Sequence, residues 1–226
     1  MKITNLISSI IVNYIRIGNK TELYQPTYNV KNLRLFRSDL EKRSSDDRVD
    51  VIQDNMPGIP GSYLDVGSQL GYFVFKMSEK GFLSCGIEAN PVSCVYASNV
   101  ANLNGVKNAS FLNFPLDLST VDSLPEYDVI SILSVYHHMV YFFGKDDADI
   151  VLKKLIGKCR KRFFFETGEY EEKGFYWTDG LSFMGEDSSM GITKFLEEFG
   201  FSSITKIGEH ATHLTDHKRS LFMCEK

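Results

Sequence analysis

The sequence predicts an α/β fold in which helices cover both faces of a seven-stranded, mostly parallel sheet. Three observations support this prediction. Short apolar runs alternate with stretches of helical periodicity, which is typical of a parallel sheet. A glycine-rich turn joins the first of these strands to the helix that follows it. The last two strands are separated by about ten residues, which is too short for a crossover helix, so they should be antiparallel neighbours.

Residues 1–58 are predicted to form a helical extension that precedes the main domain at 59–226. An amphipathic helix is expected first, and a capping box at Ser38–Glu41 predicts a second helix that runs towards Asn55. The first segment has no cleavage site and is too short and polar to cross a bilayer. We expect it to pack on the domain or on a second subunit, as in a homodimer, with peripheral membrane contact as the alternative. Its apolar positions are Ile3, Leu6, Ile7, Ile10, Ile11, Tyr14 and Ile15.

The main domain begins after a breaker at Pro57–Gly61. Two of the expected strands, which contain Ile130–Leu133 and Arg162–Phe165, are apolar enough to lie at the centre of the sheet. The predicted strands are 62–66, 82–88, 109–114, 127–133, 162–166, 202–208 and 219–225. The predicted helices are 70–79, 91–104, 147–160 and 191–199.

Composition limits the classes of protein to consider. The chain has 226 residues, enough for one domain with a substantial core, and 43% of them are hydrophobic. Its net charge of −4 argues against a dedicated nucleic-acid binder, which usually has a basic surface. The four cysteines are scattered and form no C-x-x-C pair, so we expect neither a disulfide framework nor a structural zinc site. A reducing compartment, the cytoplasm, is the predicted location.

The glycine-rich turn has the pattern Asp65-x-Gly67-x-x-x-Gly71. A loop without bulky side chains lets backbone N–H groups approach a ligand, and Glu88, at the end of the next strand, could accept both hydroxyls of a ribose. The pattern therefore predicts a nucleotide-type cofactor site, against the alternative of a tight turn without a ligand. A dinucleotide fingerprint requires a second glycine at position 69, where this chain has glutamine.

This motif, together with Glu88, resembles that of the class I S-adenosylmethionine-dependent methyltransferases, which have a Rossmann-like fold with a reversed last strand. The resemblance covers about residues 60–226. It implies that the first motif holds the methionine end of the cofactor, that Glu88 holds the ribose, and that Asp117 lies near the adenine. The segment from Ser134 to Val140 would lie between the sulfonium and the acceptor. The implied cofactor-binding residues are Asp65, Gly67, Ser68, Gln69, Gly71, Glu88, Ala89, Asp117, Leu118 and Ser134.

A second set of short motifs is similar to the methyltransferase domains of bacterial O-antigen chain-terminating enzymes and related polysaccharide-modifying methyltransferases. It consists of Ser134–His138, Gly144, Thr212-His213 and Arg219–Leu221. Ser220 departs from that group, in which a proline is expected at this position. The resemblance implies a saccharide acceptor.

Candidate acceptor-binding and catalytic residues gather where the strands end, because ligands of open parallel sheets bind at their carboxyl edge. All five histidines lie in segments predicted to reach this edge. A sugar hydroxyl is a poor nucleophile and needs a base, for which the candidates are His137, His138, Glu166 and His213. The candidates for substrate binding are Tyr176, Trp177, His217 and Arg219, the first two in a long loop at 167–188.

The predicted function is an S-adenosylmethionine-dependent O-methyltransferase that acts on a sugar hydroxyl of a glycan or glycolipid. Two alternatives remain open: a methyltransferase for a phosphate, an RNA end or a small metabolite, and a non-catalytic cofactor-binding subunit. A phosphate acceptor would need cationic groups, for which Lys218 and Arg219 are the local candidates. No metal site is predicted, because His210, His213 and His217 lie in a turn without a nearby cysteine.

Overall fold

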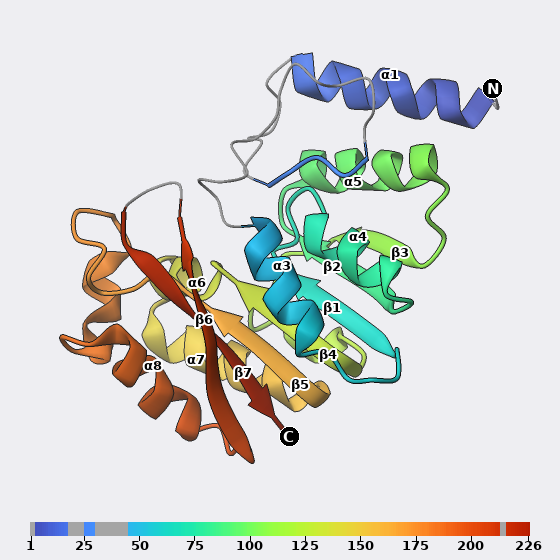
Figure 1. Ribbon diagram of the computed structural model, residues 1–226. Helices are drawn as coiled ribbons and strands as arrows, with labels where there is room; N and C mark the ends of the chain where they lie inside the picture. Colours follow the sequence, from blue (N-terminus) through green and yellow to red (C-terminus); the bar gives the residue numbers. More distant parts are fainter. Residues whose placement is uncertain (1–2, 18–24, 30–44, 213–215) are drawn as a thin grey trace.

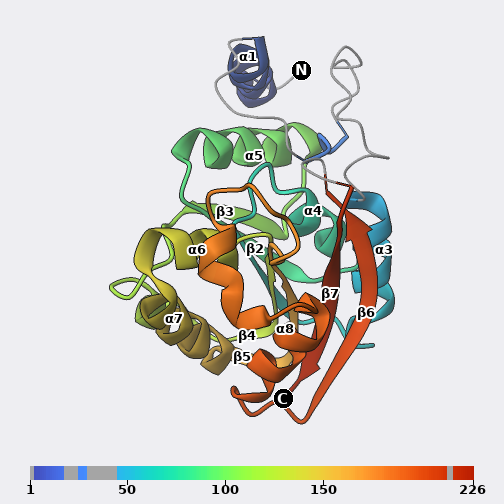
Figure 2. The same ribbon diagram turned by 90° about the vertical axis from the view of Figure 1, so that its left-hand side faces the viewer.

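The computed structural model describes residues 3–17, 25–29, 45–212 and 216–226. Seven strands form one sheet in the order β3-β2-β1-β4-β5-β7-β6. Helices cover both faces of this sheet (Figures 1 and 2). The predicted fold class is therefore confirmed.

The strands agree with the sequence prediction in number and order. β1 to β5 are parallel, whereas β7 is antiparallel to both of its neighbours, β5 and β6. The short connection between the last two strands therefore gives the antiparallel pair expected from its length. The strands are β1 (Ser62–Val66), β2 (Leu83–Glu88), β3 (Ala109–Asn113), β4 (Tyr127–Leu133), β5 (Cys159–Glu166), β6 (Ser203–Ala211) and β7 (Lys218–Glu225).

The helices differ from the prediction at two places. The segment after β4, expected to be a loop, is mostly helix α6, and Gly144 with φ of 80° separates α6 from α7. The predicted loop at 167–188 contains a 3-10 helix, η3. The capping box at Ser38–Glu41 lies outside the described residues. The helices are α1 (Ile3–Ile17), α3 (Ser45–Asp54), α4 (Tyr72–Glu79), α5 (Pro91–Asn104), α6 (Tyr136–Phe143), α7 (Lys145–Gly157) and α8 (Ser188–Glu197), with 3-10 helices η2 (Val121–Ser123) and η3 (Thr178–Met184).

The core consists of two layers because successive side chains of a strand point to opposite faces. In β4, Ile130 and Ile132 pack on one face with α7, while Val129 and Leu133 belong to the cluster on the other. Figure 2 shows the sheet between α6, α7 and α8 on one side and α3 and α4 on the other. The second cluster includes Val49 and Ile52 of α3 and Phe73 and Met77 of α4.

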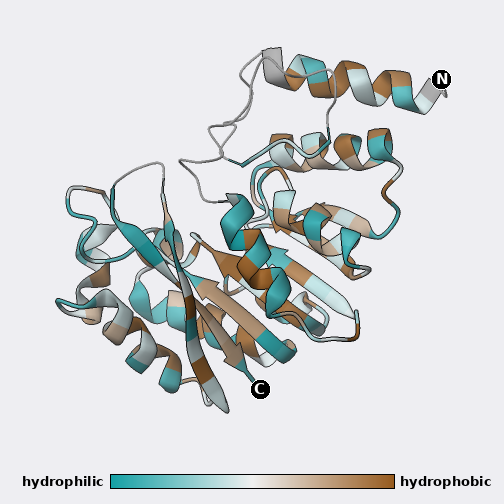
Figure 3. Cartoon of the chain, in the orientation of Figure 1, coloured by the Kyte–Doolittle hydropathy of each residue, from teal (hydrophilic) through white to brown (hydrophobic). Residues whose placement is uncertain are grey.

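Helix α1 packs along α5 at the periphery of the domain (Figure 1). Val12 and Ile15 are buried in a small cluster with Val100 and Ala101 of α5. A second set of apolar side chains on α1 stays exposed, and Figure 3 shows the apolar residues along this helix. None of the described helices is long and apolar enough to span a bilayer. The exposed side chains are Leu6, Ile7, Ile10 and Tyr14.

Candidate active site

A cavity of about 690 Å³ opens at the carboxyl ends of β1, β2 and β4, where the sequence placed the site. A volume of this size is typical of small-molecule sites. The glycine loop, the start of α6 and the segment 175–177 line it, together with three residues from the N-terminal region. These three are Gln25, Ser45 and Arg48.

Glycine is required at two positions of the turn between β1 and α4. Gly67 and Gly71 have φ values of 71° and 81°, which side-chain-bearing residues rarely adopt. A Cβ atom on Gly67 would lie 2.4 Å from Val135 Cγ2, and one on Gly71 would lie 2.2 Å from the ring of Phe111. The loop therefore packs tightly between β3 and the start of α6.

The first three amides of this loop are bonded within the protein. The N–H groups of Gly67 and Ser68 donate to the carbonyl oxygen of Ile87, at 2.9 and 3.0 Å. The N–H of Gln69 donates to Glu88 Oε2 at 2.9 Å. The start of the loop is therefore docked onto β2.

Glu88 ends β2 and is held in a fixed orientation at the cavity. Its second oxygen, Oε1, accepts the N–H of Asn90 at 2.8 Å. Asn90 is also the N-cap of α5, and Pro91 follows it, a strong signal for a helix start. Because each carboxylate oxygen has a second lone pair, Glu88 can still accept hydroxyl groups from a ligand.

Asp65 is a buried carboxylate that lines the cavity and is only 2% exposed. Ser131 donates to its Oδ1 at 2.7 Å, and Oδ2 has no hydrogen-bond partner among the described residues. Burial raises the pKa of Asp65 to about 7, opposed by the Ser131 hydrogen bond, and the charge of Glu88 raises the pKa further. A ligand that brings positive charge would satisfy this group, and S-adenosylmethionine, with its amino and sulfonium groups, fits.

Gln25, which the sequence did not single out, holds the glycine loop in place. Its backbone N–H donates to Gln69 Oε1 at 3.0 Å, and its own Oε1 accepts the N–H of Tyr72 at 3.1 Å. It thereby caps the first turn of α4. A single glutamine in a polar connection carries no local signal for such a role.

Of the remaining predicted cofactor residues, some line the cavity and others do not. Ala89 lines the cavity beside Glu88, whereas Ser68 is fully buried against β2. Asp117 and Leu118 do not line the cavity. The carboxylate of Asp117 instead accepts the Ser119 hydroxyl at 2.6 Å and the N–H groups of Ser119 and Thr120 at 2.8 and 3.1 Å. These bonds, the hydroxyl of Ser119 first, lower its pKa. The residues of this segment that line the cavity are Phe114 and Leu116.

Two buried ion pairs meet at Ser134, which directly follows β4 and has a φ of 58°. The Ser134 hydroxyl donates to Glu166 Oε1 at 2.7 Å and accepts from Arg219 at 3.0 Å. Arg48 lies 3.0 Å from Glu166 Oε2, and Arg219 forms two bonds to Glu172, at 2.7 and 2.9 Å. Each arginine is therefore neutralised by a carboxylate. Arg219 lies within β7, in agreement with the predicted strand at 219–225.

The neighbouring aromatic residues Tyr176 and Trp177 differ in their surroundings. Trp177 is 3% exposed and stacks on Phe175, with ring centroids 4.5 Å apart, as part of the core. Tyr176 is 53% exposed, and its hydroxyl lies 2.9 Å from His138 Nδ1. Both line the cavity, but only Tyr176 presents much of its ring to solvent.

His137 and His138 start α6 and line the cavity together, with ring centroids 4.1 Å apart. Burial lowers the pKa of both imidazoles, and the positive charge of Arg219 lowers the pKa further. Both are therefore neutral at pH 7. Glu166, another candidate base, is fully buried, accepts the Ser134 hydroxyl and forms an ion pair with Arg48.

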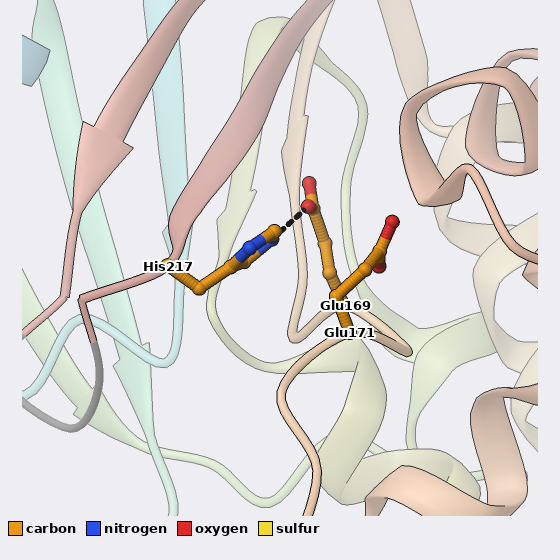
Figure 4. Close-up of side chains that lie close together, drawn as sticks. All are labelled: Glu169, Glu171 and His217. Carbon is orange, nitrogen blue, oxygen red and sulfur yellow. Dashed lines mark hydrogen bonds and ion pairs between the residues drawn. The ribbon is translucent and has the colours of Figure 1, made fainter.

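His217 lies outside the cavity lining, close to two glutamates, as Figure 4 shows. Its Nε2 is 2.6 Å from Glu169 Oε2, and ligand atoms of His217, Glu169 and Glu171 lie within 4.8 Å of one another. Glu169 also accepts the N–H of Ser220, and both oxygens of Glu171 accept from Ser188. These contacts tie the three side chains to neighbouring parts of the fold. That the protein binds no metal stays a prediction. His213 lies outside the described residues.

Comparisons with known proteins agree with this geometry. No family model matches the chain. Two Escherichia coli proteins, each described as "O-antigen chain terminator bifunctional methyltransferase/kinase WbdD", are 27% and 26% identical over 189 residues. The match covers 80% of this chain and 25% of each relative, so the chain spans about a quarter of their length.

Solved structures give the same result for the fold. A crystal structure of WbdD superposes with a TM-score of 0.77 at 24% identity, over 94% of this chain and 46% of that one. Magnesium protoporphyrin IX methyltransferase (ChlM) from Synechocystis, with bound S-adenosylmethionine, has a TM-score of 0.63 at 16% identity and matches 97% of this chain and 96% of its own. The fold is that of a class I methyltransferase. The resemblance predicted from the glycine loop is confirmed, and the predicted cofactor is the one that this neighbour binds.

Proposed function

We propose that this chain is an S-adenosylmethionine-dependent O-methyltransferase that acts on a hydroxyl group of a saccharide, in a glycan or a glycolipid. One observation carries the proposal. Two neutral histidines share a cavity with the carboxylates of Asp65 and Glu88. The similarity to the O-antigen chain terminators of Escherichia coli supports a saccharide acceptor.

One end of the cavity suits the cofactor. Glu88 is oriented by two backbone N–H groups and would accept the ribose hydroxyls. Asp65, with one oxygen free of partners among the described residues, would balance positive charge on the ligand. When bound, S-adenosylmethionine would supply a methyl group activated by a positively charged sulfur.

The other end of the cavity suits a neutral acceptor. Arg48 and Arg219 line it, but Glu166 and Glu172 neutralise both. A phosphate would have to compete with a buried carboxylate for either arginine, which is unfavourable because breaking a buried ion pair leaves a charge unpaired. A hydroxyl group needs no cation but does need a base, and the neutral histidines provide one.

The experiment first measures cofactor binding by calorimetry. S-adenosylmethionine should bind and NAD should not, and Glu88→Ala should weaken binding by about 1–3 kcal/mol because buried hydroxyls lose a charged acceptor. Asp117→Ala, a carboxylate outside the cavity lining, is the matched control. Binding of NAD, or equal affinity of the Glu88 variant, would contradict the cofactor assignment.

The second step offers four kinds of acceptor: a neutral oligosaccharide, its phosphorylated form, a short RNA and a set of small hydroxylated metabolites. Mass spectrometry should show addition of a methyl group to the neutral oligosaccharide. Transfer only to the phosphorylated saccharide or to RNA would favour the alternative acceptors. Binding of the cofactor without transfer to any acceptor, including small hydroxylated metabolites, would favour a non-catalytic subunit.

A homodimer through α1 belongs to the same proposal, with peripheral membrane contact as the alternative. The exposed apolar side chains of α1 form a stripe that includes Ile7, Ile10 and Tyr14. Ile10→Glu should abolish a dimer in sedimentation experiments and leave the cofactor site intact. A location in the reducing cytoplasm is also part of the proposal, and it is supported by the four cysteines, which are all free and buried.

A further inference from the structure

The two adjacent histidines differ in one hydrogen-bond partner of Nδ1. His137 Nδ1 lies 2.8 Å from the backbone nitrogen of Gly168 and 3.3 Å from Thr167 Oγ1, whose hydroxyl group can donate to the same nitrogen. His138 Nδ1 lies 2.9 Å from the hydroxyl oxygen of Tyr176. A backbone N–H can only donate a hydrogen bond, whereas a hydroxyl group can donate or accept one. This difference decides which ring nitrogens can carry a proton.

His137 is restricted to one neutral tautomer. Because the N–H of Gly168 donates to Nδ1, that nitrogen must present a lone pair, and the proton of the neutral ring lies on Nε2. The surroundings fix this arrangement. His137 is 1% exposed, its backbone N–H donates to Thr167 Oγ1 at 3.1 Å, and its ring packs 4.9 Å from that of Trp177. Its Nε2 can therefore donate a hydrogen bond but cannot accept a proton.

His138 can take either neutral tautomer. Tyr176 is exposed, so its hydroxyl can donate to water while it accepts from Nδ1–H of His138. In that state Nε2 has a free lone pair, and it has no hydrogen-bond partner within the part of the chain that the structure describes. His138 also lines the cavity. Glu166, by contrast, accepts the Ser134 hydroxyl at one carboxylate oxygen and forms an ion pair with Arg48 at the other.

We propose that His138, oriented by Tyr176, is the general base of the reaction, and that His137 is a positioning residue that donates a hydrogen bond from Nε2. This inference rests on the proposed function. In the step, an electron pair of the acceptor oxygen forms the bond to the methyl carbon, and the electron pair of the carbon–sulfur bond stays on sulfur. The hydroxyl proton moves to His138 Nε2, and water at the exposed side of Tyr176 receives a proton when the imidazolium returns to its neutral form.

The groups that face His138 determine its titration. They are Arg219 on β7, whose charge Glu172 balances, together with His137 on its own helix and Tyr176 from the segment opposite. Trp177 packs against the ring at 5.7 Å and carries no charge. Burial and the charge of Arg219 both lower the pKa of His138 below its usual 6.5. The rate should therefore rise with pH through a midpoint below 6.5 and stay constant at pH 7 to 8.

The first test uses nitrogen NMR of the chain labelled with ¹⁵N-histidine, and it requires no turnover. His137 should show the Nε2–H tautomer at every pH from 5.5 to 9, while His138 should titrate. The variants His137→Asn and His138→Gln assign the signals. Titration of His137, or a His138 ring locked with its proton on Nε2, would overturn the inference.

The second test measures turnover. His138→Gln should lower it at least 100-fold, with affinity for S-adenosylmethionine changed less than twofold. His137→Asn keeps an acceptor for Gly168 N–H, so it should lose less than tenfold and keep the pH midpoint. Tyr176→Phe keeps the ring and removes the hydroxyl, so it should shift the midpoint. The reverse order of the two histidine variants would overturn the assignment. Absence of transfer by the unaltered chain would refute the proposed function instead, and the NMR pattern would still decide which histidine can accept a proton.

Discussion

Replacement of Asp65 by asparagine should stabilise the protein and weaken cofactor binding at the same time. Burial raises the pKa of Asp65 from 3.8 to about 7 in the folded chain, and among the described residues Ser131 alone donates a hydrogen bond to it. This difference corresponds to about three pKa units, and at about 1.36 kcal/mol per unit the ionised group costs about 4 kcal/mol. Asparagine carries no charge and can still accept from Ser131, so this cost disappears.

The effect should depend on pH in a defined direction. Below about pH 4 the carboxyl is protonated in both the folded and the unfolded chain, so ionisation costs no stability. Between about pH 4 and pH 7 the unfolded chain loses the proton while the folded chain keeps it, so the free energy of unfolding falls as pH rises. Above pH 7 the full cost is present. The advantage of the asparagine variant should therefore grow from pH 4 to pH 7 and then level off.

Urea denaturation at pH 5, 6, 7 and 8, followed by tryptophan fluorescence, measures this effect. Asp117→Asn is the matched control, because the pKa of Asp117 is lowered by hydrogen bonds and its removal should give no such gain at high pH. Calorimetry should show that Asp65→Asn binds S-adenosylmethionine more weakly, since the positive charge of the ligand loses its partner. A variant that is less stable than the unaltered chain at pH 8, or an advantage that does not change with pH, would refute the reasoning.

Three other variants or treatments have defined outcomes. Trp177→Ala should lower the free energy of unfolding by about 3–5 kcal/mol, as for other buried aromatic residues, whereas Tyr176→Ala should change it little. Equal effects of the two variants in urea denaturation would show that Trp177 is not part of the core. Gly67→Ala should lower both stability and cofactor affinity, because its Cβ would meet Val135, and a fully stable variant in the same assays would contradict the close packing of the loop. EDTA should leave methyl transfer unchanged, and a loss that added divalent metal restores would direct attention to Glu169, Glu171 and His217.

The sequence predicted those parts of the fold whose signals are local. Asp65, Gly67 and Glu88 could be placed because a strand, a turn and the next strand follow each other directly. The antiparallel β7 could be predicted because the length of a connection limits what it can join. Helix α6 was missed because Val135, at its N-cap, makes no side-chain capping hydrogen bond, so the usual signal for a helix start is absent.

The sequence could not predict contacts between distant segments. Arg219 was expected to bind a substrate, and only the folded chain brings it next to Glu172 and Ser134. Arg48 likewise pairs with Glu166, which lies far from it in the sequence. Charged residues look alike in a sequence whether they are solvated or paired, so burial and partners have to come from the structure. The same holds for the tautomers of the two histidines.

The position of a labelled methyl group in the product tests the central claim most directly. The chain is incubated with S-adenosylmethionine that carries a ¹³C-methyl group and with an equimolar mixture of a neutral oligosaccharide and its phosphorylated form. Carbon NMR of the products should show the label as a methyl ether on a sugar hydroxyl of the neutral oligosaccharide. Label found only as a methyl ester on phosphate, with the neutral oligosaccharide unmodified, would contradict the account.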